Sequence, residues 1–191
     1  EIQTKLEILD DEFQMRHRRN PIHHMQSRLK TIQSMLEKLK RKNYEVSINS
    51  AVKNLQDIAG IRVICSYVQD VYTIANLLVS QDDVHLVRMA DYIREPKPNG
   101  YRSLHLIVEI PVFLSEGRIL VPVEVQIRTI AMDFWASLEH SLRYKAQEYI
   151  PQHISDELQR VATDIASLDQ RMQAIHDQVD ELSDARSDNA T

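Results

Sequence analysis

Glycine is scarce in this chain, with three among 191 residues and none in a glycine-rich phosphate loop. A Walker-type or dinucleotide-binding grip, which depends on such a loop, is therefore excluded. A single cysteine, Cys65, excludes a disulfide framework or a cysteine metal cluster within one chain, and its apolar neighbours favour a buried, inert thiol. No apolar run approaches the ~20 residues that span a bilayer, and no secretory leader opens the chain. We therefore expect a cytoplasmic protein with no membrane partner.

Acidic residues dominate overall, with a formal net charge of -5, but basic residues gather near the N-terminus. Residues 14–42 contain nine Lys or Arg residues and one acid, Glu37. A positive patch in an acidic protein indicates a specific polyanion site more than bulk nucleic-acid binding. The alternative is an ordinary solvated helix face.

Apolar periodicity and turn signals predict an α/β (α+β) body with a mixed, partly antiparallel sheet flanked by helices. The hydrophobic content of 43% suffices for one such body of about 150 residues with an appendage. The predicted helices are 1–19, 23–42, 71–79 and 130–148, and the predicted strands are 58–66, 84–89, 102–110 and 119–128, the last two as a hairpin.

The C-terminal segment carries an apolar seam from Ile154 to Leu182, with spacings that alternate between four and three residues. This coiled-coil pattern over four heptads calls for a partner helix, either the N-terminal helix of the same chain or another subunit. We therefore predict a domain at 1–150 that includes the N-terminal helix, an amphipathic oligomerisation helix at 151–183 and a disordered tail at 184–191.

Two rows of polar side chains alternate with apolar residues along two predicted strands. Rings, carboxylates, amides and guanidinium groups on one sheet face favour a ligand over plain solvent. A tyrosine directly after an Asn-Gly turn can stack on a base, with Asn99 at the edge of that base. The rows are Tyr101, Ser103 and His105, and Glu124, Gln126 and Arg128.

Any phosphate must be held by side chains here, because the phosphate loops are missing. Lys30, Ser34, Lys38 and Arg41 fall within about 80° of one another on the wheel of the predicted helix 23–42. This arc lies away from the apolar stripe and suits phosphate oxygens. Arg28 lies off the arc, so a role for it requires another direction of approach or an irregular start to the helix.

Two carboxylates, Asp57 and Glu124, precede or lie within apolar runs of the same predicted sheet and can converge on Mg²⁺. The alternatives are that Asp57 caps a turn and that Glu124 pairs with Arg128. Adjacent histidines such as His23 and His24 cannot easily face one ion, so a structural zinc site is disfavoured.

Four motifs in this order resemble the synthetase domain of RelA/SpoT-type proteins, over roughly residues 20 to 150. They are DIAGIR at 57–62, NGYRSLH at 99–105, EVQIRT at 124–129 and WASLEH at 135–140. Because no hydrolase or regulatory domain flanks them, the chain is most similar to a single-domain small alarmone synthetase of the RelP-type branch.

The resemblance implies transfer of the β,γ-pyrophosphoryl group of ATP to the 3′-hydroxyl of GDP or GTP, with Mg²⁺ as cofactor. It also favours a tetramer as the homo-oligomer, with a dimer as the alternative on symmetry grounds. It also implies roles for particular residues. Those implied for ATP are Arg28 and Arg62 around adenine, with Lys30, Ser34, Lys38 and Arg41 on the phosphates. Those implied for the acceptor nucleotide are Lys97, Asn99, Tyr101 and His105, while Asp57 and Glu124 are implied as metal ligands and catalytic residues.

Two other functional classes remain open from the sequence. A non-catalytic nucleotide or single-stranded RNA binder would use the same tyrosine and basic segment. Carboxylates beside bound phosphates, without a metal, would repel such a ligand, which argues against this alternative. A coiled-coil adaptor explains residues 152–183 but nothing between 57 and 140.

Overall fold

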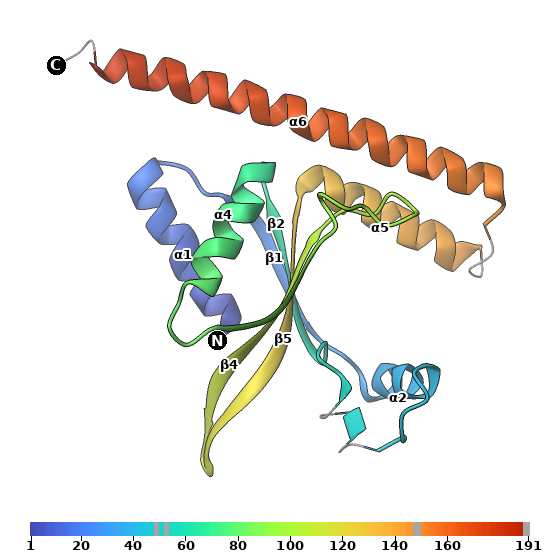
Figure 1. Cartoon of the computed structure of the whole chain (residues 1–191). Helices are drawn as coiled ribbons and strands as arrows, with labels where there is room; N and C mark the ends of the chain where they lie inside the picture. Colours follow the sequence, from blue (N-terminus) through green and yellow to red (C-terminus); the bar gives the residue numbers. More distant parts are fainter. Residues whose placement is uncertain (48–49, 52–53, 147–149, 189–191) are drawn as a thin grey trace.

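A five-stranded sheet forms the centre of the computed structural model, which describes residues 1–47, 50–51, 54–146 and 150–188 (Figure 1). The strand order is β1-β2-β5-β4-β3. Strands β2 and β5 run parallel and the other neighbouring pairs run antiparallel, so the predicted mixed, partly antiparallel sheet is confirmed. The strands are β1 Ile22–Leu29, β2 Ala59–Cys65, β3 His85–Asp91, β4 Leu104–Leu114 and β5 Gly117–Thr129. The described helices are α1 Ile2–His17, α2 Ile32–Arg41, α4 Val68–Val79, α5 Ile130–Lys145 and α6 Gln152–Asp188.

The main core lies between one face of the sheet and the helices α1 and α4. Alternate residues of β5 belong to it, among them Val125 and Ile127, which are fully buried. Residues on opposite sides of a strand alternate, so Glu124 and Gln126 project from the other face. The sheet therefore has an apolar face under two helices and a polar face that is open to a ligand.

The predicted helix 23–42 is wrong in its first half. Residues Ile22–Leu29 form β1, which pairs with β2 along its whole length, and the helix α2 begins only at Ile32. The side chain of Thr31 caps α2 by accepting a hydrogen bond from the backbone N–H of Ser34. Backbone pairing with β2 satisfies the groups of this edge strand that face β2, so the apparent helical spacing of Met25 and Leu29 does not reflect a helix.

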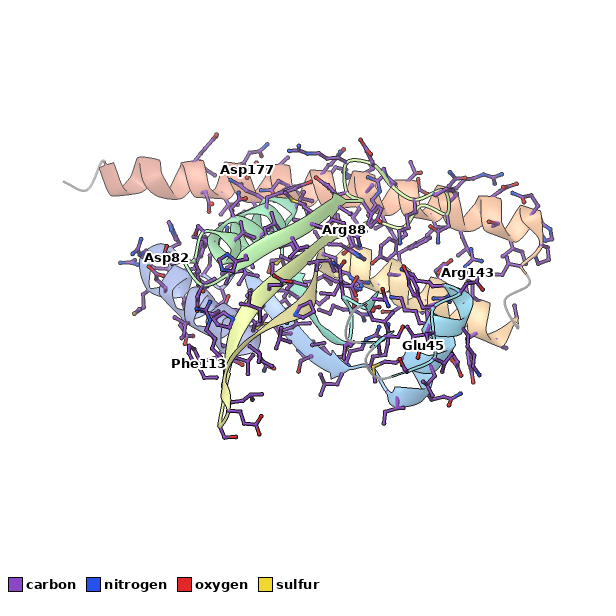
Figure 2. All side chains as sticks on the ribbon, turned by 60° about the horizontal axis from the view of Figure 1, so that its bottom comes forward. Glu45, Asp82, Arg88, Phe113, Arg143 and Asp177 are labelled. Atoms are coloured by element: carbon purple, nitrogen blue, oxygen red, sulfur yellow. The ribbon has the colours of Figure 1, made fainter. Side chains whose placement is uncertain are left out.

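The remaining elements lie close to their predicted positions. The predicted hairpin is confirmed, and its strands are longer than predicted, with Gly117 at the turn in a conformation of positive φ. Figure 2 shows Phe113 at the tip of this hairpin, away from the body of the molecule, where its side chain is exposed. The helix predicted at 130–148 is α5 as far as Lys145, while residues 147–149 lie outside the described part.

The long helix α6 lies across α4 and α5 (Figure 1). It is regular to Asp188, so residues 184–188 are helical and not part of a disordered tail as predicted, and residues 189–191 lie outside the described residues. Helix α1, one of the two predicted partners of the seam, packs against α4 and β1 instead. Seam residues such as Leu168 and Ile175 remain 49% and 53% exposed. None of the described helices is both long and apolar enough to cross a membrane.

Candidate nucleotide site

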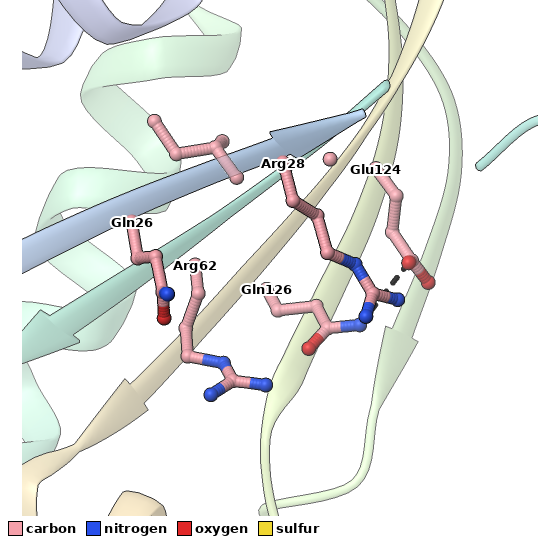
Figure 3. A pocket seen from close by; sticks show the side chains of 7 residues that line it. Gln26, Arg28, Arg62, Glu124 and Gln126 are labelled. Atoms are coloured by element: carbon pink, nitrogen blue, oxygen red, sulfur yellow. Dashed lines mark hydrogen bonds between the residues drawn. The ribbon is translucent and has the colours of Figure 1, made fainter. Parts of the chain in front are cut away.

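The polar row of β5 is held together by its own hydrogen bonds. Arg128 donates from Nη2 to Oε1 of Gln126 over 2.9 Å, and Gln126 donates from Nε2 to Oε2 of Glu124 over 3.1 Å. Figure 3 shows the second of these bonds beside the guanidinium groups of the neighbouring strands. The alternation read from the sequence is therefore confirmed, and Glu124 is oriented from one side by Gln126.

Strands β1, β2 and β5 together form a pocket of about 240 Å³ on the polar face. Residues Arg28, Gly60 and Glu124 lie opposite one another in the strand register. Because Gly60 has no side chain, space remains between the other two. Arg28 projects into this pocket from β1 (Figure 3), which is the different direction of approach that the sequence required of it. The lining also includes Gln26, Arg62 and Gln126.

Asp57 lies just before β2 and is bonded to two lysines. Both Lys30, which precedes α2, and Lys38, within α2, donate to Oδ2 of Asp57. Burial by itself would raise the pKa of Asp57, but the hydrogen bonds and positive charges of these lysines outweigh burial and lower the pKa. Oδ1 of the same carboxylate is buried and has no hydrogen-bond partner among the described residues.

The other two members of the predicted basic arc are not part of this cluster. Ser34 is exposed and its hydroxyl accepts a hydrogen bond from the hydroxyl of Thr31 over 3.0 Å. Arg41 is also exposed, in the last turn of α2. Helix α2 thus presents Lys38 to Asp57 and leaves Ser34 and Arg41 at the surface beside it.

An aromatic cluster lies next to Glu124 on the side of β4. Nδ1 of His105 is 3.5 Å from Oε1 of Glu124, and Nε2 of His105 is 2.9 Å from the hydroxyl of Tyr101. The hydrogen bond from His105 lowers the pKa of Glu124 against the opposing effect of burial. Lys97 places its ammonium group 4.5 Å from the ring centre of Tyr92 and 4.7 Å from that of Tyr101.

Asn99 is tied to helix α5. Its Nδ2 donates to Oε1 of Glu139 over 3.1 Å, and its Oδ1 accepts from the backbone N–H of Tyr101 over 3.2 Å. Both ends of the amide therefore have partners within the protein. Glu139 is only 8% exposed and also binds Arg143, so it holds the Asn-Gly turn against the body.

A second cavity of about 420 Å³ lies between the polar row and α5, and Arg62 and Arg128 are among the residues that line it. Arg128 is 2% exposed, and its guanidinium carbon lies 5.6 Å from the ring centre of Tyr101. Asp133 is 3.4 Å from Arg128 and 3.5 Å from Arg62. Burial lowers the pKa of Arg128, and the nearby positive charge of Arg62 adds to this.

The structure thus brings most of the residues predicted from the sequence together on one face of the sheet, along with several neighbours that the sequence did not predict. Gln26 was missed because residues 23–42 were predicted to form a helix, whereas Gln26 lies on strand β1. Arg128 belongs to the predicted polar row but was not assigned to the nucleotide site. No local sequence pattern indicates that Asp133 or Tyr92 lies near the site. Glu139 belongs to the motif at 135–140 but has no other indication in the sequence. Within the described part of the chain, no group of three or more His, Cys, Asp or Glu side chains is arranged to hold a metal ion.

Carboxylates, cationic groups and rings in edge-to-face contact on one open sheet face are typical of a protein that binds nucleotides through side chains. The sequence profile described as "Region found in RelA / SpoT proteins" matches residues 27–149. The chain belongs to this RelA/SpoT family.

Relatives of similar length support the same conclusion. GTP pyrophosphokinase YwaC of Bacillus subtilis (strain 168) is 45% identical over 179 residues, which cover 94% of this chain and 85% of that protein. GTP pyrophosphokinase YjbM of the same strain is 37% identical over 187 residues, 98% of this chain and 87% of that protein.

Solved structures of small alarmone synthetases have the same fold. Small alarmone synthetase 2 from Bacillus subtilis superposes with a TM-score of 0.84 at 44% identity and covers 93% of this chain and 91% of its own. Small alarmone synthetase 1 from that organism, bound to its product pppGpp, gives a TM-score of 0.83 at 38% identity, with 92% and 89% covered. The predicted resemblance to small alarmone synthetases is confirmed.

Proposed function

We propose that this protein is a GTP pyrophosphokinase that transfers the β,γ-pyrophosphoryl group of ATP to the 3′-hydroxyl of GDP or GTP, yielding ppGpp or pppGpp and AMP. The observation that carries the proposal is the pocket lined by Arg28, Arg62 and Glu124, with Asp57 near enough for its charge to act on Glu124. The fold that holds this pocket is that of small alarmone synthetases. A binder without chemistry has no use for two ionised carboxylates beside bound phosphates. We expect its synthesis of (p)ppGpp to serve the stringent stress response.

The site divides into a donor side and an acceptor side. On the donor side, Arg28 and Arg62 line the pocket where we place adenine. We assign Lys30 and Lys38, which are paired with Asp57, to the phosphates of ATP, with Ser34 and Arg41 at the outer edge. On the acceptor side, Tyr101 offers its ring to guanine and Lys97 offers a positive charge beside that ring. Asn99 and His105 complete the acceptor set.

Mg²⁺ is the cofactor that fits the carboxylates. Asp57 has a buried oxygen without a hydrogen-bond partner among the described residues, and both Asp57 and Glu124 have lowered pKa values, so both are ionised at neutral pH. Two carboxylates with substrate phosphates are the usual protein share of a magnesium site. When bound, Mg²⁺ would neutralise charge on the pyrophosphoryl group. Lys30 and Lys38 both form ion pairs with Asp57 in this structure. We expect these lysines to turn toward the phosphates of ATP when it binds.

The residues themselves supply alignment and proton transfer. The acceptor 3′-oxygen attacks the β-phosphorus of ATP, the bond from that phosphorus to the α,β-bridging oxygen breaks, and AMP leaves. Glu124 takes the proton of the 3′-hydroxyl, with His105 and Gln126 fixing one carboxylate oxygen each. Arginines and lysines compensate the charge of the transferred group, so catalysis consists mostly of positioning and electrostatic stabilisation.

We also propose that α6 joins subunits. Several of its seam residues, such as Leu168 and Ile175, are about half exposed, and the outer face of α5 adds Phe134, Leu138 and Leu142, which are 59%, 50% and 47% exposed. Apolar surface of this extent on an acidic chain favours association with a second copy of the same chain. A symmetric homo-oligomer follows, with a tetramer favoured by the family resemblance and a dimer as the simpler alternative. Residues 1–150 are then the synthetase domain and residues 151–183 the oligomerisation helix.

The protein acts in the cytoplasm, where its nucleotide substrates are found, and a single buried thiol suits that compartment.

One experiment tests the proposed pyrophosphokinase activity. Purified protein is incubated with Mg²⁺, GDP and ATP labelled in its β-phosphate, and the nucleotides are resolved. We expect the label on a guanosine tetraphosphate, together with AMP. Recovery of the label only in ATP, ADP or free pyrophosphate would overturn the proposal.

A further inference from the structure

The acceptor loop rests directly on α6. Gly100, at the tip of the turn that precedes Tyr101, has a φ of +89°, and a Cβ atom added to it would lie 2.6 Å from the Cβ of Ala162. It would also lie 3.6 Å from the Cα of Gln159 on the same helix. Ala162 is 4% exposed. The loop and the helix therefore approach each other as closely as glycine and alanine allow.

The ring of Tyr101 is supported by the same part of α6. It packs against a small cluster in which Trp135, Ala136 and Ala162 are buried, and Leu158 and Ile165 of α6 border that cluster. The indole N–H of Trp135 donates to the backbone carbonyl of Leu158 over 3.0 Å. The side chain that we assign to guanine thus has α5 and α6 behind it.

A third contact ties α6 to the strand that bears Glu124. The hydroxyl of Thr129, the last residue of β5, donates to Oδ2 of Asp169 over 2.6 Å. Thr129 also caps α5 by accepting from the backbone N–H of Met132. Asp169 is 8% exposed. Helix α6 therefore fixes the end of β5 as well as the acceptor loop.

The loop has few other supports. Within it, Gly100 donates to the carbonyl of Lys97 over 2.8 Å, and Lys97 donates to the carbonyl of Tyr101 over 3.1 Å. These bonds give the turn its shape but do not place it in the protein. Its placement depends on the bond from Asn99 to Glu139, on the contacts of Tyr101 with His105 and Arg128, and on the contact of Gly100 with α6.

We propose that α6 is the rear wall of the acceptor-nucleotide site and that Ala162 is a positioning residue for Tyr101, acting through Gly100. This inference rests on the proposed function, because it assigns the loop to the acceptor nucleotide. Its consequence is that bulk at position 162 weakens the binding of GDP and leaves the binding of ATP unchanged. Helix α6 thereby belongs to the catalytic unit and does not serve association alone.

The test compares Ala162→Leu with Ala174→Leu, which adds the same side chain at an exposed position of the same helix. Titrations with GDP alone and with ATP alone are followed by calorimetry and by the fluorescence of Trp135, the only tryptophan of the chain. We expect Ala162→Leu to weaken GDP binding by about tenfold or more, the scale on which one lost base–aromatic stack acts. ATP binding should stay within about twofold of the wild type, and Ala174→Leu should change neither. An equal loss for both nucleotides, or no loss for GDP, would overturn the proposal.

A second pair of variants keeps the test valid if Ala162→Leu does not fold. Gly100→Ala places a Cβ against Ala162 and should weaken GDP binding, and adding Ala162→Gly removes the atom that it meets. The double variant should recover part of the lost affinity for GDP, because the clash is relieved while the positive φ of Gly100 remains. If the double variant binds GDP no better than Gly100→Ala, the contact with α6 does not position the loop.

The two proposals can fail separately. If the wild type makes no labelled guanosine tetraphosphate, the proposed function fails. The nucleotide titrations still measure whether Ala162 of α6 affects the binding of GDP. If the wild type synthesises guanosine tetraphosphate and Ala162→Leu raises the KM values for GDP and ATP alike, the role proposed for α6 in the acceptor site is wrong. The proposed function then stands.

Discussion

The imidazole Nδ1 of His105 on β4 lies 3.5 Å from Oε1 of Glu124, its diagonal neighbour on β5. This neighbour lowers the pKa of Glu124 and leaves the carboxylate ionised at neutral pH, as a base or metal ligand requires. Oε2 of the same carboxylate accepts a hydrogen bond from Gln126. Both oxygens are therefore oriented before any substrate arrives.

Replacement of this carboxylate should abolish synthesis. Glu124→Gln removes a metal-binding charge and the proposed base, and general-base catalysis alone contributes about 10²–10⁴-fold. Turnover should fall below about a tenth of the wild type, while ATP binding, measured by calorimetry, stays largely intact because the basic groups remain. A variant that keeps more turnover than this would contradict the assignment.

Asp57→Asn should behave in the same way if the two carboxylates act as a pair. It also removes the partner of Lys30 and Lys38, so the free lysines should bind ATP without Mg²⁺ at least as tightly as in the wild type. Loss of activity in only one of the two carboxylate variants would refute a shared Mg²⁺ site.

The two nucleotide pockets should respond to different substitutions. Tyr101→Ala should raise the KM for GDP or GTP far more than that for ATP, since a lost base stack costs about 1–3 kcal/mol at the acceptor alone. Lys38→Ala should do the reverse. Tyr101→Phe is the control, because it keeps the ring and loses only the hydroxyl that meets His105. Equal effects of Tyr101→Ala and Lys38→Ala on both substrates would mean that the pockets are wrongly assigned.

Stability should depend on pH through Asp169. Burial raises the pKa of this carboxyl, with the hydrogen bond from Thr129 opposing the effect. A carboxyl with a raised folded-state pKa loses stabilisation as the pH rises from its unfolded value, about 3.9, through its folded value. Asp169→Asn carries no charge and keeps an oxygen for Thr129. Its melting temperature should exceed that of the wild type by a few degrees near neutral pH, and the difference should shrink as the pH is lowered toward the unfolded value of about 3.9.

Asp164→Asn is the control for this experiment, because it removes the same charge from an exposed position of α6. It should show no such gain at neutral pH. A difference between Asp169→Asn and the wild type that stays constant over the whole pH range would show that ionisation of Asp169 is not its cause.

Charges in the seam of α6 should dissociate the assembly. Leu168→Glu with Ile175→Glu places two carboxylates on residues that are half exposed in the single chain, so the fold should survive while association is lost. Ser167→Glu with Ala174→Glu adds the same charges at exposed positions away from the seam and should leave association intact. Light scattering at micromolar concentration measures both. A monomeric mass for the wild type would mean that the seam needs no second subunit.

Local alternation in the sequence predicted the polar row of β5 correctly, since one residue in two must face the same side of a strand. The same reasoning failed at residues 22–29. There the spacing of Met25 and Leu29 suits a helix, and only pairing with a strand more than thirty residues away makes it β1. The odd direction of Arg28 on the helical wheel was the one local sign of this error.

The other features that the sequence did not predict depend on contacts between residues that are far apart in the chain. The sequence indicated that Lys30 and Lys38 share a direction, but not that Asp57 lies between them. It revealed the apolar seam of α6, but the face of that helix toward its own body includes Ala162, Asp169 and His176, which carry no hydrophobic signal. Such residues are recognised only when the surface against which they pack is known.

The two roles proposed for helix α6 fall on adjacent residues: Val161 belongs to the seam and Ala162 contacts the acceptor loop, and Leu168 and Asp169 repeat the arrangement one heptad later. Each residue turns a helix by about 100°, so a single insertion or deletion between positions 162 and 169 would put these pairs out of phase. Changes of seven residues would nearly preserve the phase but would displace Asp169 from Thr129 by about 10 Å. The spacing between Ala162 and Asp169 is therefore fixed by the two parts of the domain that they contact, the acceptor loop and the end of β5.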